Sequence, residues 1–117
     1  MTKKIIYLAV PYSHPDAAIR ERRFNIVNKV SASLINKGLH IFSPISHSHP
    51  IALAGELPKG IDFWLEFDRC FLEVSQKLIV LKLEGWEESK GVKAEIEIAT
   101  ELGIPIEYME PEVSYFG

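Results

Sequence analysis

The chain has 117 residues and a net charge of -3, with 13 Lys and Arg against 16 Asp and Glu. Its length predicts one domain over residues 1–117, and its 47% hydrophobic and 25% charged residues are typical of a folded globular protein. The acidic balance argues against binding to polymeric DNA or RNA, and no apolar run reaches the roughly 20 residues that cross a membrane. A lone cysteine and the lack of a signal-peptide pattern predict a cytoplasmic location.

The first half of the chain predicts a β-α-β unit. Residues 4–10 are an almost unbroken apolar run, typical of a strand buried on both faces. Helical spacing of apolar residues follows over 16–36, and Gly38 is placed to end that helix. Residues 39–43 predict a short second strand. The stretch 44–61 holds three prolines and two glycines without a sustained period, so we expect a long functional or mobile connection.

The second half continues the alternation of helices and strands. Aromatic and apolar residues recur at helical spacing over 62–74, with Asp62 available as the N-cap. Residues 77–83 predict a third strand, 92–102 a last helix, and 104–109 a fourth strand. The element order is therefore typical of a parallel sheet joined by helical crossovers.

We therefore expect an α/β fold, a three-layer Rossmann-like (flavodoxin-like) and mainly parallel sheet of four to five strands with helices on both faces. In such sheets the ligand crevice lies beyond the carboxyl ends of the strands, where the strand order reverses. Three segments are expected around it, namely 11–23, 43–60 and 83–95. The tail 110–117 either frays or docks on a neighbouring subunit.

Glu95 interrupts the apolar stripe of the last predicted helix, where Val92, Ala99 and Leu102 share its face. A buried carboxylate without a partner costs several kcal/mol, so it must be paired, protonated or turned toward a ligand cavity. The position of Glu95 near the carboxyl edge of the strands favours the cavity. The alternative is a partly exposed glutamate at a frayed helix start.

Asp68 and Tyr7 are the two residues that we associate with Glu95. Asp68 lies beside the apolar stripe of its helix, and two carboxylates at one cleft are what glycosyl transfer requires. The alternative is a solvated aspartate paired with Arg69 or a lysine. Tyr7 lies in the first strand, where it is either a core tyrosine or a hydroxyl that orients a catalytic carboxylate.

Other polar and aromatic residues of the three segments are candidates for contact with a ligand. Ser89 and Gly91 either bind an anion at the start of the last helix or cap that helix. His47 and His49, in SHSHP, have no third ligand at a defined spacing, so we predict no metal site and read them as a lid over a base or as a surface loop. The candidates for ligand binding are Tyr12, Ser13, Arg20, Arg23, His47, His49, Trp64, Ser89 and Gly91.

Three motifs together resemble the nucleoside 2-deoxyribosyltransferase superfamily: IYLAVPYS at 6–13, WLEFDRCFL around Asp68, and SKGVKAEIEIATELGIPI at 89–106. Within that superfamily, the chain resembles the 2'-deoxynucleoside 5'-phosphate N-hydrolases. The HSHPI and GWEES segments resemble the DUF1937 proteins, which are grouped with it. The chain departs from the hydrolases in the loop at 11–15, where they carry a glycine-rich sequence.

The resemblance implies an N-glycosidase that cleaves the N-glycosidic bond of a (deoxy)nucleoside 5'-monophosphate. Glu95 would be the nucleophile, Asp68 the acid that protonates the leaving base, Tyr7 the residue that holds Glu95, and Ser89 a ligand of the 5'-phosphate. No metal or organic cofactor is implied. The alternatives are a nucleoside 2-deoxyribosyltransferase and a nucleotide-binding sensor without turnover.

The resemblance also implies a homodimer or homotetramer, because related enzymes complete their sites with a neighbouring subunit. Three phenylalanines of one predicted helix exceed what a small sheet needs to cover, which favours the same expectation. The aromatic residues considered for stacking on the base are Trp64, Phe63 and Trp86. Those considered for the subunit contact are Phe63, Phe67 and Phe71.

Overall fold

The computed structural model describes residues 5–58 and 60–112. In that part of the chain, one all-parallel sheet contains β1 (Ile5–Ala9), β2 (His40–Phe42), β3 (Ser75–Leu81) and β4 (Ile106–Met109), in the order β2-β1-β3-β4. The helices are α1 (Ala17–Asn36), α2 (Pro44–Gly55), α3 (Ile61–Glu73) and α4 (Lys90–Leu102). The α/β fold is confirmed. Residue 4 of the first predicted strand, and the tail from 113 on, lie outside the described residues.

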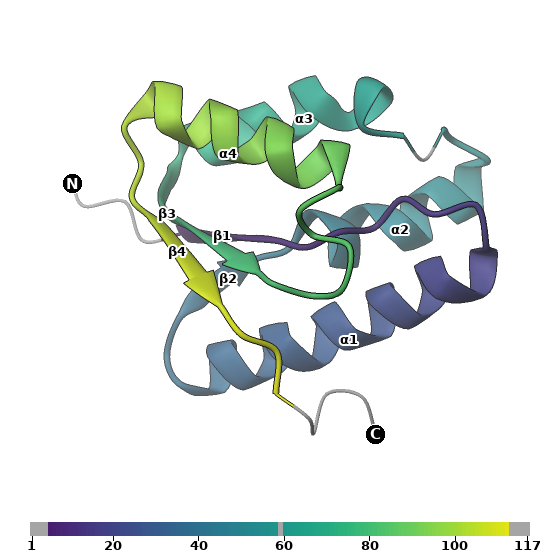
Figure 1. Ribbon diagram of the computed structural model, residues 1–117, viewed down its shortest axis with the longest axis horizontal. Helices are drawn as coiled ribbons and strands as arrows, with labels where there is room; N and C mark the ends of the chain where they lie inside the picture. Colours follow the sequence, from purple (N-terminus) through teal and green to yellow (C-terminus); the bar gives the residue numbers. More distant parts are fainter. Residues whose placement is uncertain (1–4, 59, 113–117) are drawn as a thin grey trace.

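The central strand β1 builds a separate apolar core on each face of the sheet, because successive side chains of a strand point to opposite faces. Ile6 and Leu8 pack with the apolar residues of α1, whereas Tyr7 and Ala9 pack with those of α3 and α4. Figure 1 shows α3 and α4 on one side of the sheet and α1 on the other. This double burial explains the continuous apolar runs of β1 and β3.

Residues 44–55 form the helix α2, so the irregular connection expected over 44–61 is wrong for most of its length. The hydroxyl of Ser43 caps the helix, and Pro44 stands in its first turn, where a missing N–H is tolerated. Pro50 lies inside the helix and removes one backbone hydrogen bond. Burial of one face compensates for that loss; its buried members after Pro44 are Ile45, His49 and Ala52.

The first turns of α3 and α4 determine where the residues of these two helices lie over the sheet. Gly60 occupies the N-cap position of α3 without a side-chain hydrogen bond, so the expectation that Asp62 is the N-cap is wrong. Asp62 instead lies in the first turn, where its negative charge interacts favourably with the helix dipole. The hydroxyl oxygen of Ser89 accepts a hydrogen bond of 3.2 Å from a backbone N–H of the first turn of α4. Gly103 ends α4 with a φ of 71°.

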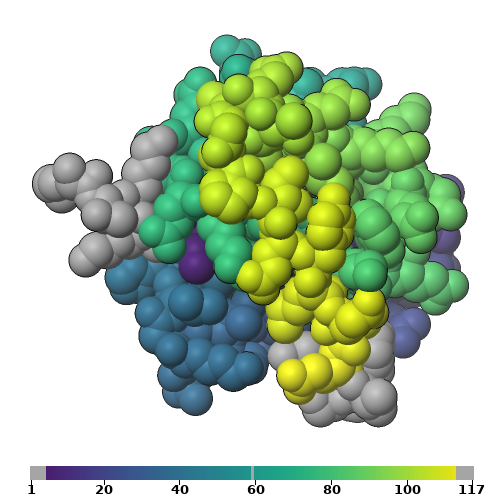
Figure 2. Space-filling model, turned by 60° about the vertical axis from the view of Figure 1, so that its left-hand side comes forward, coloured from purple at the N-terminus to yellow at the C-terminus, as the bar shows by residue number. Residues whose placement is uncertain are grey.

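The strand order reverses between β1 and β3, because the chain adds β2 on one side of β1 and then returns to add β3 on the other. A ligand crevice is expected beyond the carboxyl ends of these two strands. β4 is an edge strand, and Figure 2 shows the yellow segment that contains it running along the surface from the end of α4. Within the described ranges, no helix combines the length and the apolar character needed to cross a membrane.

Candidate functional site

A cavity of about 80 Å³ lies where the segment after β1 meets α2, α3 and the start of α4. A site for one water molecule needs roughly 10–15 Å³ of such space, so this cavity has room for several waters or for a group the size of a sugar. Its apolar lining includes Val10, Ile45 and Ile61. The polar residues that line it are Tyr12, Ser13, Ser48, His49, Asp68, Ser89 and Glu95.

Glu95 lies on α4 and turns inward, as the helical stripe predicts, with 4% of the residue exposed. The Tyr7 hydroxyl donates a hydrogen bond to its Oε2. Burial raises the pKa of Glu95 to about 8, while the Tyr7 hydrogen bond lowers it and the charge of Asp68 raises it further. The carboxyl group therefore holds its proton far more tightly than a glutamate in water does.

Asp68 lies on α3 with 5% of the residue exposed, and it lines the same cavity. Burial raises its pKa to about 7, and a hydrogen-bonding interaction with Tyr7 opposes this effect. Arg69 forms ion pairs with Glu73 and Glu101 rather than with Asp68, so the alternative of a solvated, arginine-paired aspartate is wrong. Among the described residues, Asp68 Oδ1 is one of two buried side-chain atoms without a hydrogen-bond partner, which leaves it available to a ligand.

Tyr7 interacts with both acidic residues of the cavity. Its side chain is fully buried in β1 and does not line the cavity itself. Burial raises the pKa of Tyr7 well above its ordinary value, and the negative charges of Glu95 and Asp68 raise it further. The phenol therefore keeps its proton and acts as a donor, which fixes the orientation of the Glu95 carboxyl group.

A second polar group borders the cavity from α2 and from the segment after β1. The Tyr12 hydroxyl is hydrogen-bonded to His49 Nδ1, and His49 Nε2 lies 2.8 Å from Glu21 Oε2. Burial raises the pKa of Tyr12, the charge of Arg20 opposes this effect, and Glu21 adds to it. Sequence reasoning missed Glu21, because an exposed glutamate on the outer side of a helix carries no signal that a buried histidine will meet it.

The two arginines predicted to bind the ligand lie outside this cavity. Arg20 lines an adjoining open hollow that shares Ser13 with the cavity, and its guanidinium group donates to the His14 carbonyl. Arg23 donates to the carbonyls of Ser13 and Glu84, at 3.1 and 3.3 Å. Arg23 therefore braces two loops, and its expected place among the cavity residues is not confirmed.

His47 also lies outside the cavity, although its neighbour in the motif, His49, lines it. The His47 ring stacks on Phe67, with ring centroids 5.6 Å apart. Phe71 stacks on Phe42 at 4.1 Å, so these aromatic side chains cover one another within the chain. The excess of apolar surface expected from Phe67 and Phe71 is therefore used inside the fold.

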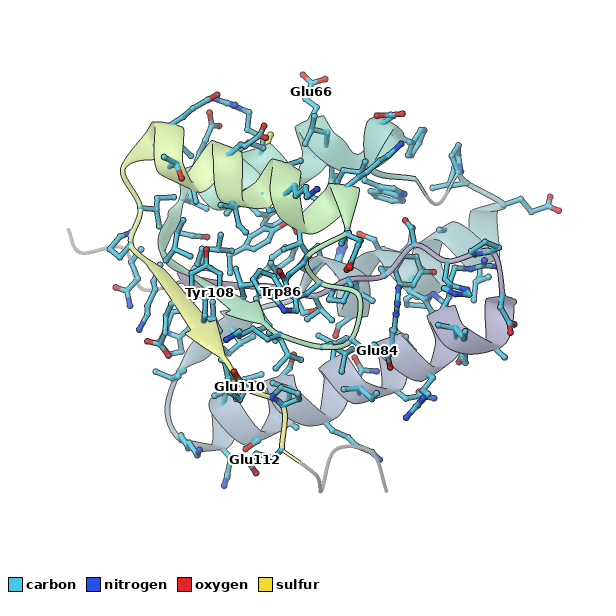
Figure 3. The ribbon with its side chains drawn as sticks, in the orientation of Figure 1. Glu66, Glu84, Trp86, Tyr108, Glu110 and Glu112 are labelled. Atoms are coloured by element: carbon cyan, nitrogen blue, oxygen red, sulfur yellow. The ribbon has the colours of Figure 1, made fainter. Side chains whose placement is uncertain are left out.

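Of the aromatic residues considered for stacking on a base, Trp64 lines the cavity. Its indole N–H donates to the Pro58 carbonyl at 2.7 Å, which fixes the ring. Trp86 packs against Tyr108 at the edge of the sheet, with ring centroids 5.6 Å apart (Figure 3). Phe63 is half exposed and contacts the edge of Trp64.

The buried Glu95 carboxyl group makes the stability of the fold depend on pH. Its pKa is raised in the native state, so the native state binds more protons than the unfolded chain between about pH 4.5 and 8. Stability contributed by this residue is therefore present at low pH and is lost as the pH rises through that window. The charged form destabilises the fold most above about pH 8.

Glu95→Gln is expected to stabilise the protein at pH 8, by on the order of 1–3 kcal/mol, and to have little effect near pH 4.5. Urea unfolding of both proteins at a series of pH values measures this difference. Glu97→Gln, an exposed site on the same helix, serves as the control and should change nothing. A Glu95→Gln protein less stable than the parent at pH 8 contradicts the assignment of a costly buried charge.

Among residues 5–58 and 60–112, no three His, Cys, Asp or Glu side chains are grouped so that they could hold a metal ion. A family model described as a domain of unknown function (DUF1937) matches residues 4–111. That range contains every residue of the cavity and of the Tyr12 and Tyr7 hydrogen bonds. No curated protein matches the chain.

Proposed function

The chain belongs to the DUF1937 family, and we propose that it is an N-glycosidase that releases the base from a (deoxy)nucleoside 5'-monophosphate. The observation that carries this proposal is the pair of buried carboxyl groups, Glu95 and Asp68, on one sugar-sized cavity. Paired carboxyl groups of different proton affinity are the machinery of glycosidic bond cleavage. The resemblance of the motifs to the nucleoside 2-deoxyribosyltransferase superfamily supports the same reaction class.

In the first step, a carboxylate oxygen of Glu95 attacks the anomeric carbon while the bond from that carbon to the base nitrogen breaks. The proton of Asp68 passes to the departing base, which leaves as a neutral molecule. In the second step, water attacks the anomeric carbon, Asp68 takes a proton from that water, and the ester bond to Glu95 breaks. Base and sugar phosphate are then free, and both carboxyl groups return to their starting states.

Tyr7 supports this chemistry through the hydrogen bond to Glu95 Oε2. By donating to the carboxylate, it stabilises the ionised nucleophile that burial disfavours. It also leaves the other carboxylate oxygen of Glu95 for the sugar. Tyr7 is thus a positioning residue, because it acts on the substrate through Glu95.

The start of α4 supplies the site that we propose for the 5'-phosphate. Ser89 and Gly91 both line the cavity, and backbone N–H groups at a helix start attract anions. The Ser89 oxygen accepts from the helix, so its hydroxyl proton stays free to donate to a phosphate oxygen. Arg20 adds positive charge in the adjoining hollow, which shares Ser13 with the cavity.

A panel of nucleosides and nucleoside 5'-monophosphates, with free base followed by chromatography, tests the proposed function. We expect base release from at least one monophosphate and weaker release from the matching nucleoside. If a second base increases the consumption of substrate and a new nucleoside forms, the protein is a transferase. Tight binding with no base release from any compound indicates a sensor and contradicts the glycosidase.

We also propose that the protein forms a homodimer or homotetramer. Large apolar side chains remain exposed on α2 and α3, namely Ile51 (44%), Leu53 (52%), Phe63 (50%) and Leu65 (36%). Sedimentation at micromolar concentration is expected to show a dimer or tetramer, and Phe63→Ser to shift it toward the monomer, because association buries this apolar surface. Tyr108→Phe, on the edge strand, is the control. A parent protein that sediments as a monomer contradicts this proposal.

A further inference from the structure

A series of three hydrogen-bonded side chains leads from solvent to the cavity. It reaches the cavity at residues that have no role in the mechanism proposed for Glu95, Asp68 and Tyr7. Glu21, on α1, has a side chain that is 55% exposed, and its carboxylate meets His49 Nε2 at 2.8 Å. His49 is 6% exposed, and its Nδ1 is hydrogen-bonded to the hydroxyl of Tyr12. Both Tyr12 and His49 line the cavity, so this series of hydrogen bonds ends at the cavity.

We propose that Tyr12 is a specificity-determining residue of this cavity, and that Glu21 and His49 fix its hydroxyl oxygen as a hydrogen-bond acceptor toward the ligand. The inference rests on the proposed function and extends it by assigning a chemical group to the substrate. The group that meets Tyr12 is a hydrogen-bond donor, either the exocyclic amino group of a base or a hydroxyl group of the sugar.

The direction of each hydrogen bond follows from the chemistry of the partners. An ionised carboxylate only accepts, so Nε2 of His49 must carry the proton in the bond to Glu21. In its neutral form the imidazole has one N–H, and in that form Nδ1 is the acceptor and the Tyr12 hydroxyl donates to it. The proton of Tyr12 is therefore directed away from the ligand. Arg20 takes part of the acceptor capacity of the oxygen through a hydrogen-bonding interaction, and the remaining lone pair is left for the ligand.

The packing around His49 keeps this arrangement rigid. The Phe24 ring lies over the imidazole, with centroids 4.3 Å apart and an interplanar angle of 30°. His49 belongs to the buried face of α2 and is followed by Pro50, whose ring fixes the local backbone. A polar group held this way cannot rotate to suit a ligand without a donor, and leaving it unpaired weakens binding.

Binding of matched nucleotides tests the proposal, with Glu95→Gln as the background so that no substrate is consumed. One pair of probes is 2'-deoxyadenosine 5'-monophosphate and its analogue without the amino group, with the equivalent cytosine pair beside it. The second type of pair is the ribose and deoxyribose forms of the same monophosphate. The first type detects an amino donor on the base, and the second detects a hydroxyl donor on the sugar.

We expect calorimetry to show about tenfold tighter binding of the donor-bearing member in one type of pair. Tyr12→Phe should remove that preference, whereas Tyr108→Phe, a matched change on the edge strand, should keep it. The proposal is overturned if no pair differs, or if the preference survives Tyr12→Phe in a protein that unfolds at the parent temperature.

Glu21→Gln provides a second variant, because an amide can donate as well as accept and so no longer fixes His49. It should reduce the preference several-fold, and Glu66→Gln, an exposed site on α3, should not. If Glu21→Gln leaves the preference for the donor-bearing nucleotide unchanged, the role assigned to the hydrogen bonds from Glu21 through His49 to Tyr12 is overturned.

Nitrogen-15 NMR at about pH 8 shows which ring nitrogen of His49 carries the proton, and it needs no ligand. We expect the tautomer protonated on Nε2, and the tautomer protonated on Nδ1 overturns the proposal even where nucleotides bind and are cleaved. Failure of every nucleotide to bind overturns the proposed function, and with it the substrate assigned here. The two failures are thus distinguishable.

Discussion

Glu95→Gln is expected to lower the rate of base release at least about 10³-fold while nucleotides still bind. Glutamine keeps the size of the side chain and its contact with the Tyr7 hydroxyl, but a neutral amide cannot form the ester bond to the anomeric carbon. The loss therefore falls on kcat, and the dissociation constant of the nucleotide changes little. Single-turnover release of base, measured beside calorimetric binding, separates these two effects.

Glu97→Gln is the matched control, because residue 97 lies on the same helix and is exposed to solvent. Its kcat should equal that of the parent protein. Base release by Glu95→Gln within tenfold of the parent would remove Glu95 from the nucleophilic role. Loss of binding together with activity would assign to Glu95 a role in holding the ligand instead.

Asp68→Asn is expected to lower kcat by about 10²- to 10⁴-fold, because asparagine has no proton to give to the departing base. The loss should be smaller for bases that leave readily as anions, since they depend less on that proton. Measurement of kcat on several monophosphates of different leaving ability tests this dependence. Asp62→Asn, an exposed change in the first turn of the same helix, is the control and should have no effect.

The pH profile of the parent protein provides the second test of Asp68. The reactive form has Glu95 ionised and Asp68 protonated, so kcat/KM rises as Glu95 loses its proton and falls as Asp68 does. With pKa values of about 8 for Glu95 and about 7 for Asp68, the maximum is expected between about pH 7 and 8. Asp68→Asn should keep the rise and lose the fall. Loss of the rise instead would show that Asp68 must be ionised.

The sheet could be predicted from the sequence because its central strands are buried on both faces and therefore read as apolar runs. The inward direction of Glu95 was predictable for a similar reason, since it shares a helical stripe with Val92 and Ala99. α2 was not predicted, because Pro50 and the polar residues of its motif obscure a buried face of only a few residues. Local patterns therefore identify helices whose buried residues recur over several turns, and strands that are buried along their whole length.

Local patterns leave the contact of Tyr7 with a carboxylate as one of two alternatives, and they give no sign of the contact between Glu21 and His49. The contact of Tyr7 with Glu95 joins residues 88 positions apart, and that of Glu21 with His49 joins residues 28 apart. Each depends on how helices are placed over the sheet, which hydrophobic periodicity does not specify. Arg69 and Arg23 illustrate the same point, because Arg69 pairs with Glu101 on α4 and Arg23 donates to the Glu84 carbonyl, and neither has the role expected of it.

The most direct test of the account is the identity of the residue that becomes bonded to the sugar. A 2'-fluoro-2'-deoxynucleoside 5'-monophosphate slows the loss of the sugar, since fluorine disfavours the positive charge that develops at the anomeric carbon. After incubation with the protein, we predict a mass increase equal to one fluorinated sugar phosphate, located on Glu95, with one equivalent of base released. A sugar attached to another residue, or base released by a protein that never carries the sugar on Glu95, would contradict the account.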